Sequence, residues 1–281
     1  MKMKALASLL ISAALSVEAS AQLELVKGSP APSVFGGKKS AVEVAFRNPT
    51  GTEISSEMRT RLFQTSSSLA APVGETVWKT LRVLPGQTVL ESAALEFPAV
   101  KAPTTFLVQW VEDGGRVAGT MPVRVFPPHL LAELKPALRE GELGVLDPAN
   151  ALKPALREDG VPFVDLGEME LKDFTGKLAI LGPYATKNEM QEGLAAQVKS
   201  LAQRKVAVVW LQPPSSKPDH FAPSFFPMPS GESVTVFAQS DFVRDLPNDP
   251  QAQTRLLFLC KLALNPASMS WPALITDPTH P

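Results

Sequence analysis

The sequence predicts a two-domain protein, with an all-β sandwich followed by an α/β domain that has a doubly wound, mainly parallel sheet. Three observations support this prediction. Apolar and polar residues alternate between residues 22 and 126, which is the period of half-buried strands. After Pro127-Pro128, short apolar runs alternate with helical patterns, which is typical of parallel β–α–β units. Without residues 1–21 the chain keeps about 260 residues, enough for two cores.

Residues 1–21 have the features of a cleaved secretory signal peptide. Lys2 and Lys4 precede an apolar run at 5–17, and Ala19-Ser20-Ala21 places small residues before the cleavage point. The apolar run is too short to span a bilayer. We therefore expect an exported protein, periplasmic or extracellular, whose mature chain begins at Gln22 and has no membrane span.

Composition restricts the partners and the chemistry. The net charge is −1 and no Lys/Arg cluster occurs, so nucleic acid is not an expected partner. Cys260 is the sole cysteine, which rules out an intramolecular disulfide. It follows Leu257-Phe258-Leu259, and apolar surroundings raise a thiol pKa and leave the thiol inert. The expected partner is an envelope protein or a small ligand.

The N-terminal domain is expected over residues 22–127. Its clearest element is a hairpin that turns at Asp113-Gly114-Gly115, because aspartate and glycine tolerate the positive φ of tight turns. About seven short strands at this spacing predict an immunoglobulin-like sandwich without the paired cysteines of an antibody domain. The best-defined strands are 41–46, 77–84, 89–97, 104–112 and 116–126.

A linker with a leading helix is expected at 128–142, the α/β domain at 143–266 and a tail at 267–281. Thr186 and Glu189 form a capping box before a long helix that reaches Leu201, and Asp249-Pro250 begins the last helix. A further helix is expected at 149–158. The predicted strands are 143–146, 161–166, 178–181, 206–211 and 234–237.

One segment occurs twice. Residues Leu134–Glu140 have the same sequence, LKPALRE, as residues Leu152–Glu158. Two similar amphipathic helices are the simpler interpretation, since repeat architectures need three or more copies to bury a continuous core. The alternative is a pair of docking helices for a partner.

The order of the strands Leu143–Leu146, Val161–Leu166, Leu178–Leu181 and Val206–Leu211, with a long helix before the last, resembles the class I glutamine amidotransferase-like (flavodoxin-like) domains that follow sandwich domains in secreted bacterial proteins. The resemblance covers about 130 residues and implies the fold. Enzymes of that family carry a cysteine in a Gly-x-Cys-x-Gly turn and a downstream His-x-Glu. This sequence has neither, which argues against their chemistry.

Loops at the carboxyl ends of parallel strands line the crevice where open α/β sheets bind ligands. The residues expected at this edge are Asp147, Tyr184, Gln212, His220 and Asp241. His220 with a carboxylate would suit acid–base chemistry, but no serine lies in a Gly-x-Ser-x-Gly turn. We therefore assign no catalytic residue. The three histidines lack metal-ligand spacing, and no cofactor is implied.

The leading hypothesis is an exported, non-catalytic interaction or ligand-binding protein of the bacterial cell envelope. One alternative is a hydrolase that acts at the strand-end crevice. The other is an accessory module of a carbohydrate-processing or envelope complex, for which Trp78 and Trp271 are the candidate sugar-stacking residues.

Overall fold

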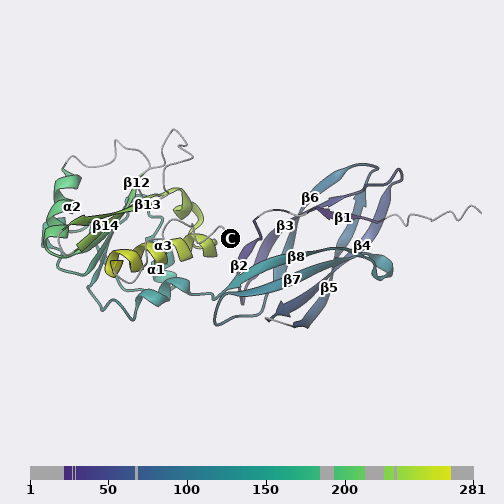
Figure 1. Ribbon diagram of the computed structural model, residues 1–281, viewed down its shortest axis with the longest axis horizontal. Coiled ribbons are helices and arrows are strands. Elements are labelled where there is room, and N and C mark those ends of the chain that lie inside the picture. Colours follow the sequence, from purple (N-terminus) through teal and green to yellow (C-terminus); the bar gives the residue numbers. More distant parts are fainter. Residues whose placement is uncertain are drawn as a thin grey trace, which may run out of the picture.

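The structure is a computed structural model that describes residues 22–26, 28, 30–66, 69–183, 193–212, 225–230 and 233–266, with the backbone alone at 225–230 and 233. The expected signal peptide and the tail at 267–281 lie outside the described residues. Figure 1 shows two units along the long axis of the molecule. We call residues 22–126 the two-sheet unit and residues 130–266 the six-stranded unit.

The two-sheet unit contains one antiparallel sheet and one mixed sheet. The three-stranded sheet has the order β1 (Glu24–Val26), β3 (Lys39–Arg47), β6 (Thr88–Glu96). The five-stranded sheet has the order β2 (Ser33–Phe35), β8 (Val117–Phe126), β7 (Thr104–Val111), β4 (Ile54–Thr65), β5 (Ala70–Val83), and β2 runs parallel to β8. In strands such as β3 and β4 apolar and polar side chains alternate, so that one face of the strand is buried.

One apolar core joins these two sheets. Phe46 of β3, Met58 of β4 and Trp110 of β7 are fully buried in it. β7 and β8 form the hairpin that the sequence predicts, and the short 3-10 helix η1 (Asp113–Gly115) makes its turn. Gly114 has φ +82° there, a conformation that side chains with a Cβ rarely adopt.

The six-stranded unit has one sheet with helices on both faces. Its strand order is β10 (Val164–Asp165), β9 (Leu143–Leu146), β11 (Leu178–Leu181), β12 (Ala207–Gln212), β14 (Ser233–Gln239), β13 (Phe225–Ser230), and β13 alone runs antiparallel to its neighbour. The helices are α1 (Lys153–Glu158), α2 (Leu194–Gln203) and α3 (Pro250–Leu264), with the 3-10 helices η2 (Leu130–Leu134), η3 (Leu171–Asp173) and η5 (Asp241–Asp245). α1 and α3 share one core, and α2 packs into another.

The two units share apolar core at their junction. Phe35 and Phe126, at the ends of β2 and β8, belong to the same buried cluster as Leu131 of η2. The Nδ1 atom of His129 lies 3.1 Å from Oδ1 of Asp159, while Oδ2 of this buried carboxylate accepts a 2.8 Å hydrogen bond from the Leu131 N–H. The junction is therefore packed rather than a free linker.

The predicted fold class is wrong. The chain is mostly β, with a mixed, curled sheet in its first part and no clear doubly wound α/β domain in its second. An immunoglobulin-like sandwich consists of two antiparallel sheets, whereas β2 is parallel to β8. A doubly wound sheet needs a helical crossover after each strand, but only η3 lies between β10 and β11, and α1 has only six residues. The edge strand β13 lies between the predicted strands 206–211 and 234–237, where the sequence predicted no strand.

The two LKPALRE copies also differ from the expectation of two similar helices. Residues 153–158 form α1, with Leu152 as the N-cap, but in the first copy only Leu134 is helical, at the end of η2, and the rest is turn and coil. The carboxylate of Asp147 accepts hydrogen bonds from the N–H groups of Leu152 and Lys153 and so caps the second copy. The Lys135 N–H of the first copy instead donates to the backbone oxygen of Ala132.

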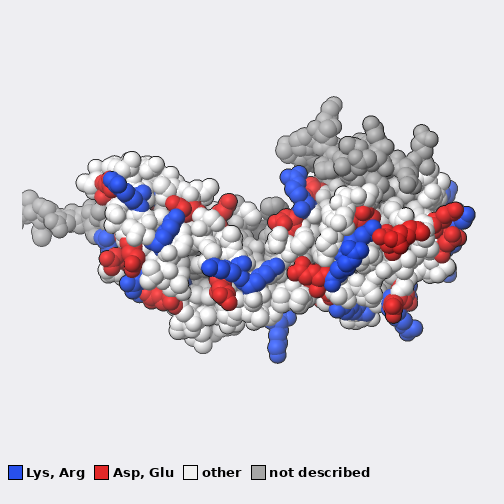
Figure 2. All heavy atoms as spheres, turned by 180° about the vertical axis from the view of Figure 1, so that it is seen from behind, with Lys and Arg blue, Asp and Glu red and all other residues white. Residues whose placement is uncertain are grey.

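Figure 2 shows that basic and acidic side chains alternate over the face in view, without a region of one sign. Many of them form ion pairs, such as Lys261 with Glu133 at 2.6 Å. In the described part of the chain, no helix combines the length and the apolarity that crossing a bilayer requires.

Candidate binding groove

Asp147, the first residue expected at the strand-end crevice, is buried and has a structural role. It follows β9, and its two carboxylate oxygens accept backbone hydrogen bonds from Ala151 at 3.0 Å, Leu152 at 2.8 Å and Lys153 at 3.0 Å. These are the N–H groups at the start of α1, which have no partner within the helix. Asp147 is therefore committed to capping a helix.

Gln212 and Asp241 do lie near one another at this edge. Gln212 ends β12 opposite Gln239 of β14, and its backbone oxygen accepts a 2.8 Å hydrogen bond from the Ser240 N–H. Asp241 follows at the start of η5 and is exposed. Tyr184 and His220 lie outside the described residues, so the five candidates are not assembled into one described site.

A shallow hollow of about 300 Å³ lies beside the end of β9 and the segment after β10, and charged side chains in it and next to it form ion pairs. The Nζ atom of Lys153 lies 2.6 Å from Oδ2 of Asp165, which lowers the pKa of that carboxyl group. On the rim, Lys172 pairs with Glu170 at 2.5 Å. The residues around the hollow are Leu146, Leu166, Gly167, Met169, Glu170, Leu171, Lys172 and Gln197. Among the lining side chains, Lys172 and Glu170 are paired with each other and Gln197 adds one uncharged amide.

The two-sheet unit contains the larger depression, which we call the β5/β6 groove. It has a volume of about 510 Å³ and lies between β5 and β6, the last strands of the two sheets. Its apolar lining comes from four strands and the segment after β6. The lining residues are Lys39, Thr60, Leu62, Val73, Gly74, Thr76, Val77, Trp78, Ala94, Leu95, Glu96, Phe97, Pro98 and Val108.

Two β-bulges shape this groove. In the β4–β5 ladder, Leu62 pairs with Gly74 and Phe63 with Pro72, so Val73 has no partner. In the same ladder Met58 pairs with Lys79 and Arg59 with Val77, so Trp78 also has no partner. A bulge turns a side chain out of the regular alternation. Both skipped residues line the groove, and Val73 is 42% exposed.

An aromatic cluster holds Trp78 in place. Its ring lies 4.9 Å from the ring of Trp110, edge to face, and 6.1 Å from that of Phe46. On β5, Lys79 Nζ lies 4.9 Å from the Trp78 ring centroid. Edge-to-face aromatic pairs add about 0.5–1.5 kcal/mol beyond burial. These contacts fix the orientation of the Trp78 ring on one wall of the groove.

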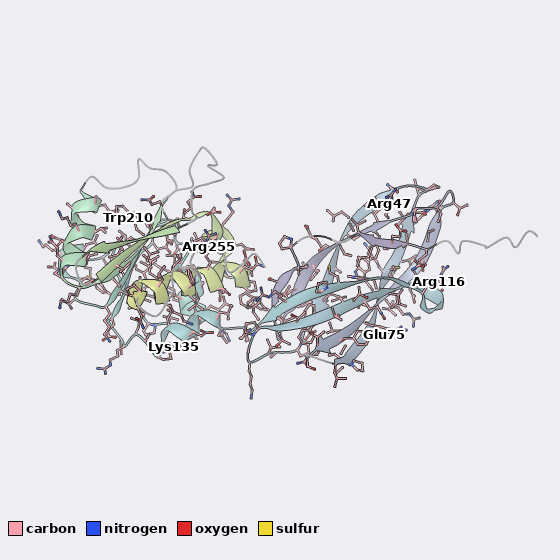
Figure 3. All side chains as sticks on the ribbon, in the orientation of Figure 1. Arg47, Glu75, Arg116, Lys135, Trp210 and Arg255 are labelled. Carbon is pink, nitrogen blue, oxygen red and sulfur yellow. The ribbon has the colours of Figure 1, made fainter. Side chains whose placement is uncertain are left out.

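Charged groups mark the ends and the outer side of the groove. Lys79 pairs with Glu91 of β6 and closes it toward the turn between β5 and β6. At the other end, Lys39 and Glu96 lie opposite each other in the β3–β6 ladder. On β5, Glu75, which is labelled in Figure 3, pairs with Arg61 at 2.8 Å. The ends are polar and the middle is apolar.

Sequence reasoning identified Trp78 only as an isolated aromatic residue and did not find the groove. The bulges were hidden because a skipped residue changes the period of a strand without changing its composition. The available signal was the position of Val73 and Val77 just after Pro72, a residue that favours edge strands.

No protein-family model matches this chain, and no curated protein matches it. Among solved structures, the alkylpurine DNA glycosylase AlkC of Pseudomonas fluorescens bound to DNA with an abasic site analogue aligns at 11% identity and a TM-score of 0.30, over 38% of this chain and 31% of that one. A β-glucosidase of Listeria innocua with gluconolactone aligns at 17% identity and a TM-score of 0.28, over 38% and 16%. The CsuC–CsuE chaperone–tip adhesion subunit complex of Acinetobacter baumannii aligns at 11% identity and a TM-score of 0.27, over 39% and 58%. This chain covers less than two thirds of each, and likenesses this weak support no conclusion about fold or function.

Proposed function

We propose that this protein is an exported, non-catalytic binding protein of the bacterial cell envelope, and that the β5/β6 groove is its binding surface. One observation carries the proposal. An apolar depression of about 510 Å³ opens between two edge strands, within the usual size range of ligand sites.

The lining favours an apolar occupant. Leu62, Leu95 and Val108 line the groove together with the exposed Val73 and Val77. Burying apolar surface contributes about 25 cal/mol for each Å² removed from water. The hydroxyl group of the exposed Thr76 can orient such an occupant by a hydrogen bond.

The β5 edge is poorly suited to adding a further strand. Pro72 has no N–H to donate, and the bulges at Val73 and Trp78 interrupt its regular spacing. Insertion of apolar groups between the sheets is the favoured mode, because it needs no regular strand pairing.

A non-catalytic role fits the described strand-end edge. Asp147, which a hydrolase would need as a free carboxylate, is held by three backbone N–H groups. The hydrolase alternative then depends on His220 and Tyr184, outside the described residues. It has no support from the contacts described above.

The test is photo-crosslinking in a bacterial host that exports the protein. The crosslinker benzoylphenylalanine replaces Val73 in the groove or, as the control, Val117, which is 38% exposed on β8 outside the groove lining. The proposal expects a discrete adduct from position 73 alone, and its loss when Leu95→Lys places a charge in the groove. Equal adducts at both positions, or none at 73, would contradict it.

A further inference from the structure

The first strand is fastened to the end of the two-sheet unit that carries the β7–β8 turn. The Gln22 side-chain amide donates to the backbone oxygen of Val117, and the Leu23 side chain is fully buried in the core. Beyond Leu23, β1 pairs with β3 from Glu24 to Val26. Figure 3 shows Arg116 at this end of the molecule, away from the six-stranded unit.

A buried carboxylate holds this segment. The side chain of Glu112, at the end of β7, has no exposed surface, and its Oε1 atom accepts the Leu23 N–H at 2.5 Å. Its Oε2 atom accepts a 3.1 Å hydrogen bond from Nη2 of Arg116, whose side chain is 41% exposed. Burial raises the pKa of Glu112, against the opposing effects of Leu23 and Arg116.

The path of β1 is fixed sterically as well. A Cβ atom at Gly119 of β8 would overlap the Cβ atom of Leu25. Gly119 therefore lets β1 lie directly against β8, and Gln22 cannot move far from Glu112 while Leu23 and Leu25 stay packed.

Signal-peptide cleavage would change the charge at this place. Hydrolysis of the Ala21–Gln22 bond adds one water, breaks the C–N bond, and leaves a carboxylate on Ala21 and an amino group on Gln22. An α-amino group has a pKa of about 7.7–8.0 and is partly or mostly protonated at neutral pH. Consecutive residues are about 3.8 Å apart, so the new ammonium group lies one residue from the nitrogen atom that Glu112 binds.

We propose that the α-ammonium group of Gln22, once released by cleavage, pairs with Glu112 and locks β1 in the fold. A buried carboxylate keeps its charge at low cost only when cations and hydrogen bonds compensate it. Cleavage thereby stabilises the mature protein. This inference rests on the proposed export and on cleavage after Ala21.

The experiment compares two recombinant proteins, residues 22–281 and residues 21–281, each with Glu112 and with Glu112→Gln. A fusion protease that leaves no extra residue produces both starts. The extra Ala21 moves the ammonium group one residue away from Glu112. With Glu112, the equilibrium constant for unfolding in urea should be about tenfold smaller for 22–281 than for 21–281. A tenfold change corresponds to a shift of about one unit in the pKa of a paired group. With Glu112→Gln the two lengths should differ by less than about twofold.

Equal length effects in both backgrounds, or no length effect with Glu112, would overturn the inference. Because an N-terminal glutamine can cyclise with loss of ammonia and of the charge, intact mass is checked for each sample. If Glu112→Gln does not fold, the pKa of the α-amino group of 22–281 is measured by NMR after isotope labelling of the amine. A pKa at or below the ordinary range contradicts the pairing, and a raised one supports it. Both recombinant starts are defined in advance, so a failure of cleavage in the host is scored separately from a failure of the pairing.

Discussion

The Gln251 side-chain amide of α3 donates a 2.8 Å hydrogen bond to the Ser33 hydroxyl of β2, across 218 positions of sequence. This bond joins the last helix to one of the first strands at the junction of the two units. Phe35 and Phe126 are buried in the same region. The two units should therefore unfold together, although the sequence suggested separable domains.

Phe35→Ala tests this coupling. Phe35 is 1% exposed, and removing a buried phenylalanine ring costs about 3–5 kcal/mol of unfolding free energy. The variant should lower the urea midpoint equally for tryptophan fluorescence and for far-UV circular dichroism. Two separate transitions would instead show that the units fold independently. Val117→Ala on the exposed end of β8 is the control and should change stability by less than about 0.5 kcal/mol.

Asp147→Ala tests the capping role. The substitution leaves the N–H groups at the start of α1 without their side-chain acceptor and should cost about 1–2 kcal/mol of unfolding free energy. Asp147→Asn keeps one acceptor oxygen and should recover part of that loss. Asp241→Ala, at an exposed position of η5, is the matched control. A stability effect of Asp147→Ala no larger than that of Asp241→Ala would exclude the cap.

The buried thiol of Cys260 should make the folded protein less stable at alkaline pH. Burial in α3 raises the pKa of its thiol to about 12, while the unfolded thiol ionises near pH 8.5. Below about pH 8.5 the thiol is protonated in both states. Above it the unfolded state releases a proton that the folded state keeps, so stability falls by up to about 1.4 kcal/mol per pH unit until the folded thiol ionises.

Urea titrations between about pH 8 and 10.5 measure this slope. Cys260→Ala should lower stability at neutral pH by on the order of 1 kcal/mol and should reduce the alkaline slope. A thiol reagent should label the wild type only after unfolding. Rapid labelling of the folded protein would show that the thiol is accessible.

Gly119→Ala probes the packing of β1. The added methyl group overlaps Leu25, so β1 must shift, at a cost of about 1–3 kcal/mol. Hydrogen exchange should become faster at the backbone amides of Leu25 and Val26, because both residues belong to the β1–β3 ladder. Gly51→Ala is the control, because a Cβ atom at Gly51 meets nothing within 4 Å. Unchanged exchange in Gly119→Ala would mean that β1 tolerates the shift.

Local signals in the sequence predicted local structure well. Val206–Leu211 was predicted as a buried strand and is β12, at residues 207–212. Asp249-Pro250 was predicted to begin the last helix, and the Asp249 side chain accepts the Gln251 N–H at 2.8 Å. These elements depend on apolar runs and caps that lie within a few residues of each other.

The predictions that were wrong concerned structure that depends on contacts between distant parts of the chain. The sequence LKPALRE forms a helix only in the copy that Asp147 caps, so the same seven residues have two different structures. The parallel pairing of β2 with β8 joins residues about 90 positions apart and leaves no local signature. The predicted strand-end crevice grouped five residues only because each was expected at the same edge of a doubly wound sheet. In the structure Asp147, one of the five, caps α1.

The turn at Leu84–Gln87 connects the edge strands of opposite sheets, and the ion pair of Lys79 with Glu91 lies just beyond it. The β5/β6 groove is therefore closed at one end by the turn that connects its two strands. Its open length along β5, from Val73 to Lys79, is about 20 Å at 3.3 Å per residue. The turn closes that end, so an occupant that lies along the groove and is longer than about 20 Å extends past the opposite end, which Val73 and Pro98 line.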